Sequence, residues 1–275
     1  MKTVINSSDN SSINFTEIKS YFGLLKFLAL RDVTVRYKQT LLGVAWSVIR
    51  PAFNILIFGS LSVILNSEKS ITDNFLMVSA CVIFWQLQSG IMSDVSNSLV
   101  SNSNILTKVY FPKIILPLSS VYLVLIDFAI SFFIFIVLYF FIKGSFTIAL
   151  LALPFALLYG VFFSFSLGLL FSAGSVKFRD VRFVLPFLVQ ILFYATPVFI
   201  TSEKMLSYNL PNTLKLIYQV NPMVQSMNLY RYCFTGVYDN FNSVYLIISI
   251  LISLVLCFVS IKLFLKLEGN FADHI

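Results

Sequence analysis

Three basic residues, Arg31, Arg36 and Lys38, are the first candidates for chemistry, because they stand directly before a long apolar run. Guanidinium and ammonium groups at a membrane surface bind phosphate oxygens, and arginine does so through two parallel hydrogen bonds. We therefore consider these side chains as candidates for binding a phosphate group at the headgroup level. Basic residues here also anchor the cytoplasmic edge of a membrane span, and this topological role stays open beside the first.

Arg50 is a further candidate, because it lies well inside the apolar run that starts at Leu41. A charged side chain inside a span is costly and is usually retained for a function. Arg50 either faces a polar channel or pairs with Asp127, the only carboxylate within a predicted span. The alternative is that its long side chain extends to the cytoplasmic surface.

The residues that several other function classes require are missing or isolated. The only histidine is His274, and no GxxxxGK phosphate loop occurs in the chain. Cys81, Cys233 and Cys257 are far apart and lack the spacing of metal ligands. We therefore expect no catalytic residue, metal or cofactor in this chain, and no ATP hydrolysis by it. A single intramembrane acid also gives little support to a proton relay.

The elements that must position these residues are membrane helices. The chain is 58% apolar and only 11% charged, whereas a soluble domain has about 25% charged residues. The net charge of +7 does not indicate nucleic-acid binding, because the basic residues lie between apolar runs. A span takes about 20 apolar residues, and polar residues at 86–89 interrupt the end of the second candidate. The six predicted spans are Leu41–Leu65, Phe75–Ile91, Ile114–Ile142, Phe146–Ala173, Phe183–Ile200 and Val244–Leu265.

The distribution of Lys and Arg orients these spans. With the N terminus inside, most basic residues fall in the inner segments, which predicts that both termini are cytoplasmic in a bacterial inner membrane. We predict a disordered segment at 1–14, an interface helix with its linker at 15–38, and one transmembrane domain at 39–275.

Two segments are predicted to be helical without spanning the membrane. Phe15–Leu30 places Ile18, Phe22, Leu25 and Leu28 on one helical face, as expected of an amphipathic helix in the membrane interface. A short soluble helix that packs on a partner is the alternative. Thr201–Ser243 holds apolar pieces too short to span, which favours short re-entrant or gate helices between the fifth and sixth spans.

Four stretches of the chain resemble the permease subunit of polysaccharide ABC exporters, most closely the O-antigen exporter permease. They are residues 31–51 (RDVTVRYKQTLLGVAWSVIRP), 101–131, 175–200 and 221–236. The first stretch is the most specific, and the likeness extends over nearly the whole chain. Capsule and teichoic-acid exporter permeases are close relatives that the sequence does not separate from this one.

The resemblance implies a six-span subunit that forms a homodimer and binds two copies of a separate ATPase subunit, which carries the ATP and magnesium. It implies a pore through which a polysaccharide on undecaprenyl diphosphate crosses the bacterial inner membrane. The three cations at 31, 36 and 38 would then bind the lipid diphosphate. In this family the N-terminal helix and the connection between the second and third spans contact the ATPase.

Polar and aromatic side chains in the first, second and fifth spans are the candidates for lining such a pore. Aromatic planes stack on the C–H faces of sugar rings and let a polymer slide without tight hydrogen bonds. Packing against lipid or neighbouring helices is the alternative for each ring. The candidates are Trp46, Arg50, Phe53, Phe84, Trp85, Phe187, Gln190 and Tyr194.

The segment KVYFPK at 108–113 is the candidate for coupling to the ATPase, through Lys108, Tyr110 and Phe111. An ordinary basic inside loop is the alternative. From another function class, an ion-coupled small-molecule transporter remains a rival, although it would need more intramembrane acids than one.

Overall fold

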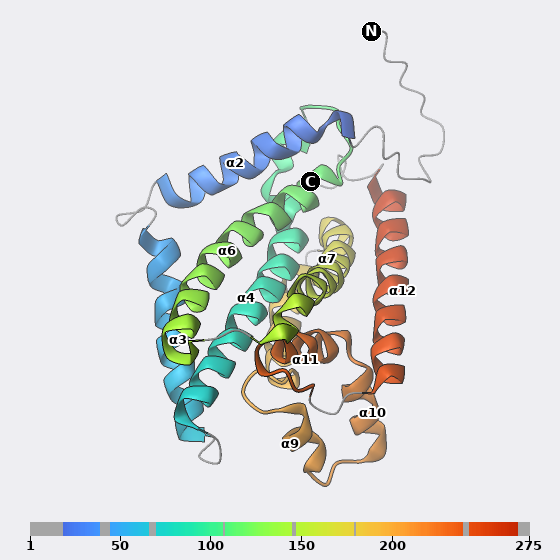
Figure 1. Cartoon of the computed structure of the whole chain (residues 1–275). Helices are drawn as coiled ribbons and strands as arrows, with labels where there is room; N and C mark the ends of the chain where they lie inside the picture. Colours follow the sequence, from blue (N-terminus) through green and yellow to red (C-terminus); the bar gives the residue numbers. More distant parts are fainter. Residues whose placement is uncertain are drawn as a thin grey trace.

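The fold was examined in a computed structural model, which describes residues 19–38, 45–65, 70–106, 108–144, 147–178, 180–238 and 242–268 (Figure 1). Over these residues every regular element is a helix, in agreement with the predicted all-α class. The segment predicted to be disordered, at 1–14, and the histidine at 274 lie outside the described residues.

Five helices in the described residues are long and apolar enough to cross a membrane. They are α3 (Trp46–Leu65), α4 (Ile71–Ser101), α6 (Ile115–Lys143), α7 (Leu153–Lys177, preceded by the 3-10 turn η2, Ile148–Ala152) and α12 (Ser243–Glu268). α4 is the central helix, because it packs against α3, α6 and α7. In the most apolar 18-residue stretch of α4, 72% is buried, whereas in the corresponding stretch of α12 only 17% is buried. α12 is therefore a peripheral helix.

Small residues let α4 and α7 approach each other closely. A Cβ added at Gly160 would lie 2.5 Å from Cζ of Phe84, and one added at Gly168 would lie 2.9 Å from Cβ of Val95. Gly160, Ser164, Gly168 and Ser172 follow one another at four-residue spacing, so they share one face of α7. Small residues at this spacing are typical of tightly packed membrane helices.

The predicted fifth span, Phe183–Ile200, is not observed as a long helix. The structure has α8 (Val181–Ala195), whose 15 residues extend about 22 Å, less than the roughly 30 Å of a hydrocarbon core. The helix ends there because Thr196 precedes Pro197, and a residue before proline disfavours the helical conformation. The predicted count of six spans is therefore not confirmed.

The second predicted span, Phe75–Ile91, is longer than expected, since α4 continues to Ser101. The polar residue Gln88 does not end the helix, because it is fully buried and its Nε2 donates to Oγ of Ser226, 2.8 Å away. Oε1 of the same amide has no hydrogen-bond partner among the described residues, so only the donor side of Gln88 is satisfied in the core.

α2 (Phe22–Lys38) lies across the ends of the long helices, at the end where α12 terminates (Figure 1). We call this the α2 end of the bundle. The helix packs against α6 and buries Leu28 and Ala29, whereas Phe22 is 64% exposed. It differs from the predicted Phe15–Leu30 helix in continuing through the whole basic cluster, and residues 15–18 lie outside the described residues.

Three short helices stand between α8 and α12 in the described part of 201–243, as predicted. They are α9 (Ser202–Ser207), α10 (Asn212–Val220) and α11 (Pro222–Thr235). α11 is almost entirely buried and packs against α7 and α4, whereas α10 buries none of its residues. α9 and α10 lie at the end of the bundle opposite α2 (Figure 1), which we call the α9 end.

Candidate functional site at the α2 end and along two exposed helix faces

Arg36 joins three helices at the α2 end. Its Nη1 donates to Oδ2 of Asp127 on α6 at 2.6 Å, and its Nη2 donates to Oδ2 of Asp94 on α4 at 3.0 Å. Burial alone lowers the pKa of Arg36, but the attraction of the two carboxylates outweighs it and raises the pKa above its ordinary value. One arginine therefore balances two acids in a half-exposed cluster.

The proposed pair between Arg50 and Asp127 is not formed, because Asp127 accepts from Arg36 instead. The reason is the position of α2, whose last turn folds back over the bundle and reaches the α6 carboxylate. Arg50 lies on an exposed part of α3. Asp94 was not predicted from the sequence, since no periodicity or charge run around it indicates an ion pair with Arg36, which is 58 positions away.

Arg31 makes a second connection between α2 and α4. Its Nη2 donates to Oδ1 of Asp32 and to Oδ1 of Asn102, each at 2.6 Å. Asn102 follows the last residue of α4, and its Nδ2 donates to the carbonyl of Ser98 at 2.9 Å. Arg31 is thus partly neutralised and fixes α2 on the end of α4.

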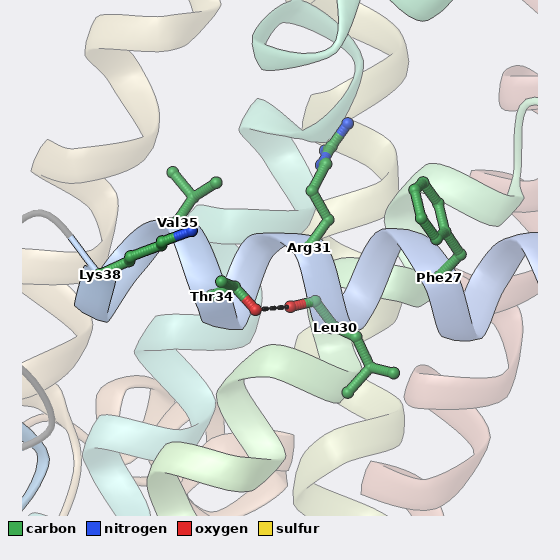
Figure 2. Close-up of a pocket in the computed structure, with 6 residues that line it drawn as sticks. All are labelled: Phe27, Leu30, Arg31, Thr34, Val35 and Lys38. Atoms are coloured by element: carbon green, nitrogen blue, oxygen red, sulfur yellow. Dashed lines mark hydrogen bonds between the residues drawn. The ribbon is translucent and has the colours of Figure 1, made fainter.

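The outward side of α2 forms a shallow hollow of about 410 Å³ (Figure 2). It is lined by Phe27, Leu30, Arg31, Thr34, Val35 and Lys38. Figure 2 shows that all six come from this one helix, with the Thr34 hydroxyl donating to the Leu30 carbonyl at 2.8 Å. The hollow is therefore an open, mostly apolar face that carries two cationic side chains.

Six of the eight predicted pore-lining residues lie on two exposed faces. On α3, Trp46, Arg50 and Phe53 are exposed and follow one another at helical spacing. The second set, on α8, is Phe187, Gln190 and Tyr194. Ring contacts between Phe58 on α3 and Phe193 on α8, 6.4 Å between centroids, bring these two helices together.

The other two predicted pore-lining residues, Phe84 and Trp85, lie in the core of the chain. Phe84 is 0% exposed and stacks on Tyr230 of α11, with ring centroids 4.3 Å apart and planes 3° apart. Trp85 is 7% exposed and packs on Phe193 at 5.4 Å. Both rings are buried within the chain because α4 is the central helix rather than a surface helix, and their pore-lining role stays a prediction.

The predicted coupling segment has one anchor and one exposed tip. Lys108 and Tyr110 are exposed, whereas Phe111 is only 3% exposed and serves as the anchor. Next to it, the backbone N–H of Lys113 donates to Oε1 of Glu268 at 2.9 Å, and Nζ of Lys113 donates to the Glu268 carbonyl. Glu268, at the end of α12, was not predicted from the sequence.

At the α9 end, Arg231 of α11 is buried and fixes the segment that follows α8. Its Nη2 donates to the carbonyls of Pro197 and Val198, the first at 2.5 Å. Arg231 lies in the segment between the last two predicted spans, and nothing in its sequence neighbourhood indicated burial. Among the described residues, no group of three His, Cys, Asp or Glu side chains is arranged to hold a metal ion.

Known proteins match the chain over almost its whole length. The profile of the ABC-2 type transporter family matches residues 23–235. Two O-antigen export system permease proteins RfbA from Klebsiella pneumoniae are 26% and 24% identical, each over 92% of this chain and 95% of the relative. The protein of the same name from Myxococcus xanthus is 27% identical over 79% of this chain and 82% of its own length.

These matches confirm the resemblance that the sequence motifs indicated. The family profile covers α2 through α11, and therefore includes both the α2 end and the buried helix at the α9 end. The chain is a multi-pass membrane permease subunit and belongs to the ABC-2 type transporter family.

Proposed function

We propose that this chain forms the membrane pore of an ATP-driven exporter that moves a lipid-linked polysaccharide, most closely O-antigen, across the bacterial inner membrane. The observation that carries the proposal is the similarity, over 79% to 92% of this chain, to three permeases named for O-antigen export. ATP hydrolysis is assigned to a separate ATPase subunit. Both termini and the α2 end are assigned to the cytoplasm, as the positive-inside rule predicts.

A homodimer would supply the conduit for the polymer. In a single chain, the faces of α3 and α8 carry Trp46, Phe53 and Tyr194, whose side chains are exposed and are not part of the core. Pairing two copies across these faces would enclose aromatic planes and the polar side chain of Gln190. Such a lining offers weak, repeated contacts to sugar rings, as a sliding polymer requires.

The outward side of α2 is proposed to receive the lipid diphosphate. Its apolar side chains suit acyl chains, and Lys38 and Arg31 suit phosphate oxygens. Both arginines differ from Lys38, because an anion would compete with Asp94 and Asp127 at Arg36 and with Asp32 at Arg31. Reversing the charge in Lys38→Glu should lower export, whereas Lys26→Glu, an exposed control on the same helix, should not. Equal export by both variants would remove Lys38 from the site.

The exposed tip at Lys108–Tyr110 is proposed to contact the ATPase. It lies at the α2 end and presents an aromatic ring, 62% exposed in Tyr110, beside a cation. Alanine at Tyr110 should lower polymer export while leaving the fold intact, because the side chain is not part of the core. Alanine at Phe111 should instead destabilise the fold, because that ring is buried.

Deleting this chain tests the whole proposal. In a deletion strain, lipid-linked polymer should accumulate on the cytoplasmic side, and a tagged copy should restore export and co-purify with an ATPase. Restored export that survives inactivation of the ATPase would instead favour an ion-coupled transporter. The sugar composition of the trapped polymer distinguishes O-antigen from capsule and teichoic acid. Absence of any trapped polymer would contradict the proposal.

A further inference from the structure

The connection between α5 (Ser103–Leu106) and α6 is fastened to the last residue of α12. Lys113 donates two hydrogen bonds to Glu268, a residue that is 155 positions away in the sequence. The Lys113 backbone N–H donates to the Glu268 carboxylate, and the Lys113 ammonium group donates to the Glu268 backbone carbonyl. We refer to these two hydrogen bonds as the 113–268 latch.

Each half of the latch satisfies a helix end. The carboxylate of Glu268 lies beside the start of α6, which begins at Ile115, and a negative charge is favourable at the positive end of a helix dipole. The ammonium group of Lys113 donates to the carbonyl of Glu268 at the end of α12, and a cation is favourable near the C-terminal end of a helix. The latch therefore joins the two helix ends through charge as well as through hydrogen bonds.

The latch also limits where the exposed tip can lie. On one side of the tip, Leu106 is buried, and on the other side Phe111 is buried. Between these anchors, Lys108, Val109 and Tyr110 are exposed. The 113–268 latch follows directly after the second anchor, so the orientation of the tip depends on the end of α12 as well as on the core.

We propose that Glu268 is a positioning residue for coupling: through Lys113 it holds the 108–110 tip in the orientation that the partner ATPase engages. α12 then becomes part of the path from the ATPase to the pore, although it is the most peripheral span. The inference rests on the proposed function, since it takes the tip as the ATPase contact.

The test measures polymer exported and ATP hydrolysed by the assembled permease–ATPase complex in native membranes. Glu268→Ala should lower the polymer exported per ATP by about tenfold, because the bond from the Lys113 N–H and the negative charge beside the start of α6 are lost together, while the backbone carbonyl of residue 268 stays. Glu268→Gln keeps an acceptor oxygen, and Lys113→Met removes only the cation, so both should give intermediate ratios. Asp73→Ala is the matched control, because it breaks the exposed pair with Lys143 at the opposite end of α6.

The outcomes separate this inference from the proposed function. An unaltered ratio in Glu268→Ala, with a normally assembled complex, would overturn the role of Glu268. If Glu268→Ala does not accumulate, Glu268→Gln and Lys113→Met provide the test. Wild-type values of polymer exported per ATP in both variants would then also overturn the role of Glu268. An equal loss in Asp73→Ala would also contradict it. Failure of the unaltered chain to bind any ATPase would instead refute the proposed function.

Discussion

The two ends of the bundle are held together by different kinds of interaction. At the α2 end, half-exposed charged groups join separate helices, as in the cluster of Arg36 with Asp94 and Asp127. At the α9 end, buried groups do so: Arg231 bonds to backbone carbonyls, and Tyr230 stacks on Phe84. Half-exposed ion pairs contribute about 0–1 kcal/mol and weaken with salt, whereas an unsatisfied buried group costs about 1–3 kcal/mol. The α2 end is thus suited to rearrangement and the α9 end to rigidity.

The largest expected effect is at the α9 end, in Arg231→Met. Removing the guanidinium leaves the carbonyls of Pro197 and Val198 without their buried donor, so the free energy of unfolding should fall by about 2 to 3 kcal/mol. Thermal unfolding in detergent measures the change. The exposed charge in Glu203→Ala, also at this end, is the control and should have little effect. Equal stability of both variants would contradict the rigid character of the α9 end.

Gly160→Ala tests the packing of the core between the two ends. The added Cβ would lie 2.5 Å from the ring of Phe84, which is stacked and has no room to move, so overpacking should cost about 1–3 kcal/mol. Gly23→Ala in α2 is the control, since a Cβ there meets nothing within 4 Å, and it should stabilise the helix by about 0.5–1 kcal/mol. Thermal unfolding of the two variants should therefore shift in opposite directions.

Breaking the Arg36 cluster should have a smaller effect that depends on salt. Arg36→Ala should cost about 1 kcal/mol or less and should loosen α2, which limited proteolysis of the helix can detect. Exchanging the charges in Arg36→Asp with Asp127→Arg should restore part of the protection. Restoration by an exchange of Arg50 with Asp127 would instead show that the observed pairing does not hold in the membrane.

The smallest effect on stability is expected at the exposed faces. Phe53→Ala should change the free energy of unfolding by about 0.5 kcal/mol or less, because the ring is 60% exposed, yet it should lower export if the ring lines the pore. Phe141→Ala on α6, 82% exposed, is the matched control and should affect neither quantity. Export and stability measured on the same samples separate a pore-lining ring from a packing ring.

The sequence was sufficient for the elements whose length depends on uninterrupted apolar residues. α6 and α12 begin and end within a few residues of the predicted spans, because the one proline of α6, Pro117, lies in its first turn, where proline is tolerated, and α12 contains no proline. α8 was overestimated, since the apolar residues at 198–200 continue past Pro197 while the helix does not. Hydropathy does not report where a helix ends, and here the end is set by Pro197.

The candidate site was harder to predict, because its partners are distant in sequence. The cations at 31, 36 and 38 were recognised from their position before a span, but their acceptors Asp94 and Asn102 were not. These acceptors meet α2 only once it folds back over the bundle. The core position of Phe84 was missed for a similar reason, since composition cannot distinguish a central helix from a surface helix.

The close packing of α4 on α7 has a mechanical consequence. Both helices run from the α9 end to the α2 end. Because the contacts at Gly160 and Gly168 leave no space between them, we expect the two helices to move together as one rigid unit. α4 has 31 residues, which gives a lever arm of about 46 Å. A tilt of about 5° would therefore displace one end by about 4 Å relative to the other. A small tilt of α4 at Asp94, near the α2 end, would thus displace the opposite end of the helix by a distance comparable to the size of a sugar ring.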